Sequence, residues 1–484
     1  MAGVLSILLA LALLMYLAFR GVTLLILAPA MAVFAAALGG GLPLLGAYTQ
    51  IFMSNMGDFI IAFFPLFLLG AVFGKLMDDS GSAKSIARAI IGWLGAERAV
   101  LAVVLCCAVL TYGGVSLFVV AFAIFPVAAA LFRDADIPKR LIPASLALGA
   151  FTFTMSALPG TPAIQNAIPM PYFGTTAFAA PGLGVVAAIL MFSLGMAWLN
   201  RRVTEAKTSG EGYGIHDDAV PESNLEVREG AARDGFDIRE LEHDQPERDE
   251  PPPFAVAAAP VGIVVLVNFL FVQFVVPQMD TSYLQQPIFG ATTIDAVRGV
   301  WAVIVALLTA IVFILIVNWV RIESVKASVD QGANASVIPI ANTASLVGFG
   351  AVIAAMPAFQ TISEGLLALG QLSPLVSLAI AVNLLSAVTG SASGGMSIAL
   401  DTLGPTYVEL AKAQNISLEA MHRVTSISSG ALDALPHNGA VITVLGICKL
   451  GHKEAYGDMF MVAVVGPMIS LVCIVLLASV VGGF

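Results

Sequence analysis

The segment that decides the fold of this chain reads Ser156-Ala157-Leu158-Pro159-Gly160-Thr161-Pro162-Ala163-Ile164. A related segment near the other end reads Asp433-Ala434-Leu435-Pro436-His437-Asn438-Gly439-Ala440-Val441-Ile442. The shared Ala-Leu-Pro tripeptides begin at residues 157 and 434, an offset of 277. Both lie in long apolar runs, where proline removes a backbone donor and breaks a helix. One such break alone is equally well an ordinary proline kink, but two related breaks in two related halves predict the binding site of a transporter.

The composition of the chain is that of a membrane protein. Of its 484 residues 58% are hydrophobic and 11% are charged, and the mean hydropathy is +0.93. Soluble domains contain about 25% charged residues. Apolar runs long enough to cross a bilayer as helices recur from end to end. We therefore predict an all-α polytopic membrane protein.

The cysteines are typical of small buried hydrophobic side chains. Cys106, Cys107, Cys448 and Cys473 lie in or at the ends of apolar segments, without metal-ligand spacing. Residues 4–19 lack the basic start of a signal peptide, so we expect them to be kept as the first helix. We expect no metal, no cofactor and no nucleic-acid partner.

The first predicted half, residues 1–200, contains an apolar segment at 99–132 that is interrupted at 111–116. Its arms are about 12 and 16 residues long, short of the roughly 20 that a crossing helix needs. A re-entrant hairpin, which enters and leaves on one side, fits those lengths. The other predicted elements are helices at 3–19, 22–39 and 58–77, an amphipathic interfacial helix at 83–94, a broken helix at 141–173 and a complete helix at 179–199.

Residues 201–253 separate the two halves. Residues 201–250 hold 15 of the 32 acidic and 7 of the 22 basic residues, and three prolines follow. This composition predicts a disordered acidic cytoplasmic linker. The second half, residues 254–484, repeats the first with spans at 254–276, 297–320, 336–357 and 457–481, a polar interfacial stretch from 321, a hairpin at 374–411 interrupted at 389–395, and a broken helix at 417–448.

Lysine and arginine residues predict how the halves are oriented, because cytoplasmic loops are enriched in them. The basic clusters fall on one side if the first helix runs from outside to inside and the helix at 254–276 runs from inside to outside. The halves then form an inverted repeat with two re-entrant hairpins and two broken helices, an architecture of secondary transporters. Lys412 and Arg423 fall on the outer side in this arrangement.

Four segments of the chain resemble the gluconate permease (GntP) family, and they lie at 111–116, 156–162, 389–395 and 429–439. The last, Ser429-Gly430-Ala431-Leu432-Asp433-Ala434-Leu435-Pro436-His437-Asn438-Gly439, is most similar to D-β-hydroxybutyrate permease-like members. The resemblance covers nearly the whole chain except about 201–253. It implies proton-coupled uptake of small hydroxy-carboxylates across the bacterial inner membrane. The wider ion-transporter superfamily implies a homodimer with a scaffold and an elevator-like moving domain.

An anionic substrate requires positive potential, which the N-termini of half-helices supply through their dipoles and free N–H groups. Glycines at the hairpin tips let backbone approach a ligand. No lysine or arginine lies in the tips or breaks, which favours a monocarboxylate over a di- or tricarboxylate. For any single serine or glycine, helix packing is an equally good explanation. The predicted substrate-binding residues are Thr111, Gly113, Gly114, Ser116, Thr161, Gln165, Asn166, Thr389, Ser391, Ser393, Gly394, Gly395 and Asn438.

Asp433 and His437 are the ionisable residues of the second break, four positions apart. Ionisable residues inside a membrane are functional candidates, and histidine titrates near neutral pH, so we predict that this pair couples transport to protons. The alternative is that Asp433 caps a half-helix and His437 only donates a hydrogen bond. We expect His422 and Arg423 to be interfacial. The next proton candidates are Asp58 and Asp401.

The sequence therefore predicts a symporter for a small hydroxy-monocarboxylate of the gluconate or 3-hydroxybutyrate type. A sodium-coupled carboxylate transporter remains an alternative, because unwound carbonyls and hydroxyl groups can also hold Na⁺. An anion channel would need a polar or charged pore ring, and the sequence has paired glycine-rich breaks instead. A membrane enzyme is not indicated, since no nucleophile–base set, metal cluster or nucleotide loop is apparent.

Overall fold

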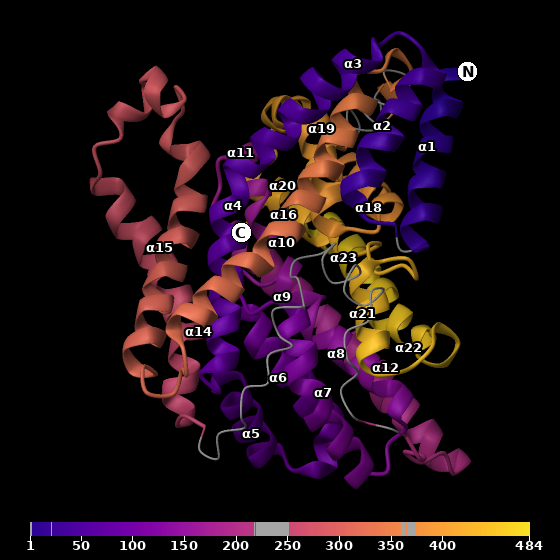
Figure 1. Ribbon diagram of the computed structural model, residues 1–484, viewed down its shortest axis with the longest axis vertical. Helices are drawn as coiled ribbons and strands as arrows, with labels where there is room; N and C mark the ends of the chain where they lie inside the picture. Colours follow the sequence, from indigo (N-terminus) through magenta and orange to yellow (C-terminus); the bar gives the residue numbers. More distant parts are fainter. Residues whose placement is uncertain (1, 21, 217, 219–250, 360–363, 366–372) are drawn as a thin grey trace.

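The computed structural model describes residues 2–20, 22–216, 218, 251–359, 364–365 and 373–484, and it is built of helices (Figure 1). Seven helical segments among these residues are long and apolar enough to cross a membrane. The predicted class, an all-α polytopic membrane protein, is therefore confirmed.

The first half contains both full-length and interrupted helices. Two helices and a long third one precede the first hairpin, and a broken helix and a final long helix follow it. The main elements are α1 (Ala2–Phe19), α2 (Leu24–Gly39), α4 (Met53–Asp79), α5 (Ser82–Leu94), α6 (Ala99–Tyr112), α7 (Leu117–Asp134), α8 (Ile142–Ala150), α9 (Phe153–Ser156), α10 (Ile164–Ala167), α11 (Pro169–Phe173) and α12 (Pro181–Ser209).

The second half repeats this order of elements. Short 3₁₀ and π-helical turns extend several of its helices. The main elements are α14 (Phe254–Leu270), α15 (Ile294–Val317), α16 (Val325–Ala355), α18 (Pro374–Thr389), α19 (Ala392–Ala413), α20 (Leu418–Ser429), α21 (Gly439–Ile447), α22 (Gly457–Phe460) and α23 (Gly466–Val481).

The two halves form the predicted inverted repeat. An offset of 277 residues carries the hairpin α6–α7 onto α18–α19 and the broken helix α8–α10 onto α20–α21. The first hairpin lies at the lower end of the molecule in Figure 1 and the second at the upper end. Because related elements point in opposite directions, a hairpin enters from each end of the molecule.

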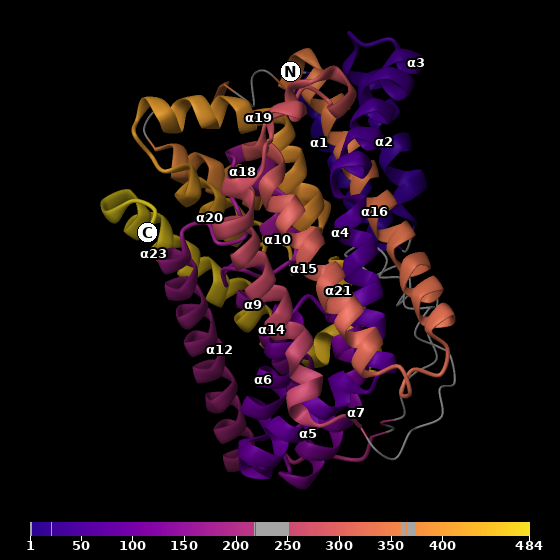
Figure 2. The same cartoon turned by 90° about the vertical axis from the view of Figure 1, so that its left-hand side faces the viewer.

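Six helices make a framework in which α14 and α15 lie at one edge and α1 and α2 at the other, with α4 and α16 between them (Figure 1). The long helices α4 and α16 pack along each other, while α2 packs on α16 and α15 packs on α4. This exchange of partners between the halves is the contact pattern that an internal two-fold relation produces. Figure 2 shows α4 and α16 on the side of the molecule away from α12 and α23.

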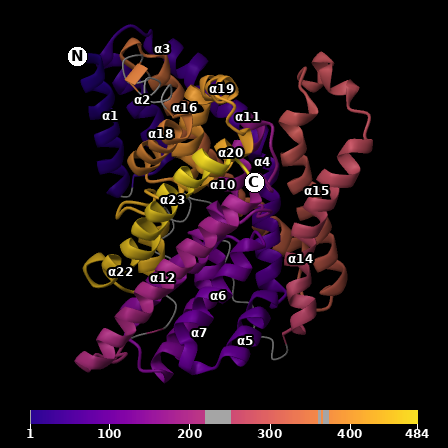
Figure 3. The ribbon, with the colours of Figure 1, turned by 180° about the vertical axis from the view of Figure 1, so that it is seen from behind.

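The helices α6–α12 and α18–α23 make a hairpin domain, and α5 packs on both α6 of this domain and α14 of the framework. The outer face of the hairpin domain carries α12 and α23, which run side by side (Figure 3). Both hairpins and both broken helices lie between that outer face and the framework. The breaks are therefore enclosed by protein, which is the setting in which irregular backbone is tolerated at membrane depth.

Three predicted boundaries are corrected by the structure. Helix α4 begins at Met53 rather than 58, α16 begins at Val325 rather than 336, and α12 continues to Ser209 rather than ending at 199. Hydropathy detects only the apolar part of a helix, whereas alanine, lysine, arginine and glutamate continue a helix into the polar region. The predicted linker therefore starts later than 201, and its stretch 219–250 lies outside the described residues.

A network of charged side chains joins both halves at the end of the molecule that carries the first hairpin. Asp458 on α22 is buried and accepts hydrogen bonds from Arg140 Nη1 at 2.7 Å, Arg202 Nε at 2.8 Å and Trp198 Nε1 at 3.0 Å. Arg140 also holds Glu211, and its hydrogen bond lowers the pKa of the Glu211 carboxyl below its ordinary value. The segment after α12 is thus bound to the base of the hairpin domain.

Candidate functional site

In each broken helix the series of helical hydrogen bonds is interrupted in the segment that contains the Ala-Leu-Pro tripeptide, as the sequence predicts. In the first half α9 ends at Ser156 and α10 begins at Ile164, and in the second α20 ends at Ser429 and α21 begins at Gly439. The unwound backbone finds other partners, because the Gly160 amide donates to the Ala177 carbonyl at 2.8 Å. The φ of Gly160 is +84°, a left-handed conformation that glycine adopts without strain.

Each hairpin tip is tied to the break of its own half. The Tyr112 hydroxyl at the end of α6 donates to the Pro159 carbonyl at 2.8 Å. In the second half, Asn438 Nδ2 donates to the Gly390 carbonyl at 3.0 Å, and its Oδ1 caps α21 by accepting from the Val441 amide at 3.0 Å. Tip and break are thus single structural units in both halves.

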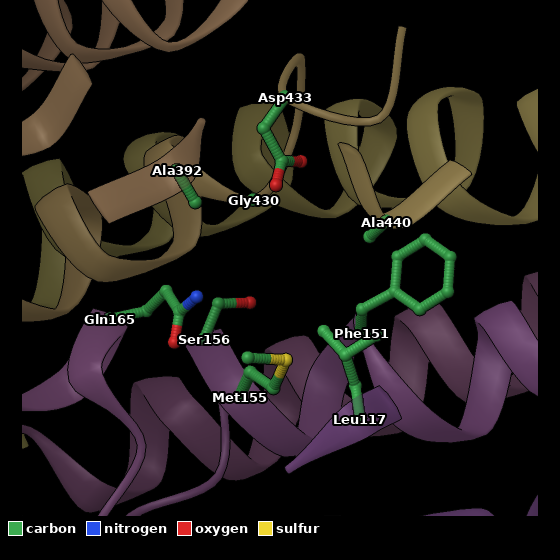
Figure 4. Close-up of a pocket in the computed structure, with 9 residues that line it drawn as sticks. All are labelled: Leu117, Phe151, Met155, Ser156, Gln165, Ala392, Gly430, Asp433 and Ala440. Atoms are coloured by element: carbon green, nitrogen blue, oxygen red, sulfur yellow. The ribbon is translucent and has the colours of Figure 1, made fainter. Parts of the chain in front are cut away.

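A cavity, here called the central cavity, lies between the two units (Figure 4), and its empty volume is about 350 Å³ including the part open to solvent. The first half forms one wall and the second half forms the other. The lining residues are Leu117, Phe151, Met155, Ser156 and Gln165 from the first half, and Ala392, Gly430, Asp433 and Ala440 from the second.

The first turns of three helices reach the central cavity. Leu117 opens α7, Ala392 opens α19, and Ala440 lies in the first turn of α21. A helix N-terminus carries about half a positive charge and free N–H groups. Convergence of three such ends gives the cavity a positive potential that favours an anion.

Polar side chains enter the central cavity from both walls. Asp433 points in from the second half, while Ser156 and Gln165 face it from the first (Figure 4). Ser156 and Asp433 are related by the 277-residue offset, so equivalent positions of the two breaks meet here. Gln165 is buried, and its Oε1 has no hydrogen-bond partner among the described residues. It is therefore available to a ligand.

A second cavity, here called the side cavity, continues from the first. It measures about 630 Å³ including the part open to solvent, and it shares Leu117, Met155 and Gln165 with the central cavity. Its polar lining includes Thr111, whose buried hydroxyl has no partner among the described residues, and Ser116. Leu66, Phe67, Gly70 and Ala71 of α4 close its other side, so it lies where the first hairpin tip meets the framework.

Five of the predicted site residues line these cavities, and they are Thr111, Gly114, Ser116, Gln165 and Asp433. The three other glycines serve packing instead. A Cβ on Gly113 would lie 2.5 Å from the Val261 side chain of α14, one on Gly394 would lie 2.5 Å from Leu346 of α16, and one on Gly395 would lie 2.2 Å from the Ser386 amide. Small residues here let the hairpins approach the framework and let the two arms of the second hairpin approach each other.

The predicted hydroxyl ligands outside the first tip are engaged locally. Thr161 Oγ1 accepts from the Ala163 amide at 3.3 Å, and Thr389 Oγ1 donates to the Leu385 carbonyl at 2.8 Å. Ser391 caps α19 and lies 3.3 Å from the hydroxyl of Ser393. These four residues do not line either cavity, because the backbone at the breaks and tips uses their oxygens.

The predicted asparagines also hold backbone rather than face the cavities. Asn166 is fully buried, and its Nδ2 donates to the carbonyls of Thr161 at 2.9 Å and Ala177 at 3.0 Å. Asn438 joins the second tip to α21, as described above. Both residues follow a break, but their side chains turn back toward the unwound segment.

Asp433 and His437 do not share a helical face. The chain between Ser429 and Gly439 is not helical, so their four-residue spacing has no helical meaning. The ring Nε2 of His437 lies 3.0 Å from the Ala387 carbonyl of the second hairpin. Only Asp433 of the pair lines the central cavity.

His422 and Arg423 were expected at the interface, and both are fully buried. Arg423 lies directly behind the cavity wall and donates to the carbonyls of Ala177 and Ala179, between α11 and α12, and of Ser156, at the end of α9. His422 bridges Thr175 Oγ1 at 2.6 Å and Asn166 Oδ1 at 3.2 Å. Sequence reasoning missed them because a charged pair near a helix start is ordinarily solvated. The available signal was their place within the short polar helix α20, which holds three serines, one threonine and three ionisable side chains beside the second break.

The part of the chain that the structure describes contains no group of three or more His, Cys, Asp or Glu side chains that could hold a metal ion. All four cysteines are free thiols, and three of them are buried. The site thus offers helix N-termini, one carboxyl group, and amide and hydroxyl groups for an organic ligand.

Comparison with known proteins gives a similar sequence and, among solved structures, similar folds. The chain is 42% identical over 465 residues to YxjC of Bacillus subtilis (strain 168), described as an uncharacterized transporter, and the match covers 95% of both chains. The crystal structure of the YdaH transporter of Alcanivorax borkumensis superimposes with a TM-score of 0.55 at 17% identity, over 90% of this chain and 89% of that one. The sequence matches no family model.

Proposed function

This chain belongs to the family of membrane transporters that includes YxjC of Bacillus subtilis, and from that membership we propose that it is a proton-coupled symporter for a small hydroxy-monocarboxylate. Gluconate and 3-hydroxybutyrate are the proposed substrate types, following the resemblance of its hairpin tips and breaks to gluconate permeases. We place its activity in the bacterial inner membrane. Homodimer formation is part of the same proposal.

The observation that carries the proposal is the central cavity. Three helix N-termini converge on it, and the polar groups of its lining are a carboxyl, an amide and a hydroxyl. An anion gains from the N-termini, and the hydroxyl of the substrate gains hydrogen bonds from Gln165 and Ser156.

Coupling follows from the carboxyl group of Asp433 in the same cavity. When Asp433 is ionised it repels a carboxylate, and when it is protonated that repulsion disappears. The anion and the proton therefore favour each other's binding, and linkage makes the effect reciprocal. The hairpin domain would carry both across the membrane by moving against the framework, with the small residues Gly113 and Gly394 at the sliding contacts.

Uptake by proteoliposomes tests the proposal. Purified protein is reconstituted and given labelled 3-hydroxybutyrate, gluconate, lactate or citrate, with a pH gradient, a sodium gradient or neither. We expect saturable accumulation of a hydroxy-monocarboxylate on the pH gradient and none of citrate. Accumulation on the sodium gradient alone would show that transport is coupled to sodium rather than to protons. Flux that neither saturates nor accumulates would indicate an anion channel.

A further inference from the structure

Arg423 is a buried cation that the site described above does not use. It lies on α20, is fully buried and is among the largest fully buried side chains of the protein. Its Nη1 lies 3.5 Å from the carbonyl oxygen of Ser156, to which the Ser426 hydroxyl also donates at 2.8 Å. Because Ser156 lines the central cavity, the guanidinium is separated from the cavity by a single residue of the wall.

The partners of the guanidinium are neutral oxygens. Nε and Nη2 donate to the Ala179 carbonyl at 3.1 and 2.8 Å, Nη2 also reaches the Ala177 carbonyl at 3.4 Å, and Nη1 donates to Asn166 Oδ1 at 3.1 Å. Within the described residues no carboxylate lies at ion-pair distance from Arg423. Carbonyl dipoles therefore hold the cation in place without cancelling its charge.

The ionisable groups around Arg423 are few. Glu419 lies one turn earlier on α20 and is exposed, Tyr112 comes from the first hairpin, and His422 is the neighbour on the same helix. A buried cation is costly unless an opposite charge or several hydrogen bonds compensate it. The central cavity, whose lining Ser156 and Asp433 share, is a place beside Arg423 where a full negative charge can sit.

We propose that Arg423 is the fixed positive charge that makes the central cavity select a monoanion. This inference rests on the proposed function, in which an organic anion occupies that cavity. One fixed cation matches one carboxylate, and the position related to Arg423 by the repeat is Leu146, so the other half adds no second charge. The hairpin tips and breaks contain no lysine or arginine, so Arg423 of α20 supplies the positive charge from behind the wall of the cavity.

The positive charge of Arg423 also links the protonation of Asp433 to the binding of the substrate. Ser156 and Asp433 face each other across the cavity, so the fixed charge lies behind one wall and the titratable carboxyl lies on the other. With Asp433 ionised, the cavity already holds its counter-charge. With Asp433 protonated, the substrate carboxylate takes that place. Arg423 acts through the field and through the backbone that it holds, which makes it a positioning residue.

The test compares an anion with a neutral molecule of the same shape. Binding of 3-hydroxybutyrate and of its amide, 3-hydroxybutyramide, to purified full-length protein is measured by calorimetry at one pH. The variants are Arg423→Gln, which removes the charge, and Arg423→Lys, which keeps it. We expect wild type to prefer the anion, Arg423→Gln to bind it about tenfold or more weakly with little change for the amide, and Arg423→Lys to recover part of the preference.

A further variant tests the inference even if the Arg423 variants do not fold. Glu419→Gln removes the exposed carboxylate one turn from Arg423, and we expect about a twofold rise in anion affinity at low ionic strength with the amide unaffected. Equal loss of anion and amide binding in Arg423→Gln, or an unchanged ratio in both variants, would overturn the inference. If wild type binds no carboxylate at all, the proposed function itself is wrong, so the two failures are distinguishable.

Discussion

Ser156 and Asp433 occupy equivalent positions of the repeat, yet only Asp433 can change its charge. Asp433→Asn imitates the protonated acid, so we expect the variant to bind substrate and exchange it, but to lose accumulation on a pH gradient. Accumulation and exchange are measured side by side in proteoliposomes, with Ser156→Ala as the matched change on the opposite wall. If Asp433→Asn still concentrates substrate as wild type does, Asp433 is not the proton site. Asp401, which accepts a hydrogen bond from Tyr172, is then the next candidate.

Gln165 and Asn166 are neighbours with opposite roles. Gln165 lines both cavities, whereas Asn166 holds two backbone carbonyls and the Arg423 guanidinium. We expect Gln165→Ala to raise the substrate half-saturation about tenfold with little change in melting temperature. Asn166→Ala should instead cost about 2–4 kcal/mol of folding stability, because buried polar partners lose their hydrogen bonds.

Thermal unfolding in detergent and uptake kinetics separate these two effects. If Asn166→Ala kept its melting temperature but lost substrate affinity, the side chain would contact substrate in another state of the transporter. The pair is a useful control because the two residues are adjacent and differ by one methylene group.

At the scale of elements, the first hairpin depends on a glycine at its tip. Gly114 has a φ of +99°, and a Cβ there would lie 2.7 Å from Pro162 Cγ of the first break. We expect Gly114→Ala to cost roughly 2 kcal/mol or more through backbone strain and this contact, and to reduce transport. Differential scanning fluorimetry and uptake measure the two losses.

Gly92 in α5 provides the matched control for that change. It lies inside a helix, and a Cβ there would meet nothing within 4 Å. Gly92→Ala should leave transport unchanged and stabilise the helix by up to about 1 kcal/mol. Equal behaviour of the two alanine variants would mean that the tip conformation is not specific to glycine.

At the scale of the whole molecule, Glu211 and Asp218 bind the segment after α12 to the hairpin domain, and the stretch 219–250 lies outside the described residues. Asp218 pairs with Arg133 and with buried Lys139 at 3.0 Å, and Glu211 pairs with Arg140 at 2.7 Å. We expect deletion of 219–250, replaced by a short Gly/Ser linker, to preserve folding and uptake. Deletion of 210–250 should lower the melting temperature by several degrees, because buried Lys139 loses Asp218 and Arg140 loses Glu211. Identical melting temperatures would show that these ion pairs contribute nothing.

The sequence by itself determined the membrane class, the order of helices, both hairpins and both breaks. Each rests on local physics: a helix that crosses a bilayer needs a certain apolar length, and proline and glycine interrupt it wherever they stand. The inverted repeat followed as well, because basic residues and the 277-residue offset are readable along the chain. The ends of α12 and α16 differ from their predicted positions, because both helices continue through polar residues that hydropathy does not count.

Only the tertiary structure decided which of those polar residues face the cavity. Gln165 and Asn166 stand side by side in the sequence, but the direction of each side chain depends on the unwound backbone that packs around it. Arg423 was assigned to the surface because burial of a cation depends on carbonyls from residues more than two hundred positions away. Short-range rules give the elements and their breaks, whereas the charge at the site arises from long-range contacts that bring one half against the other.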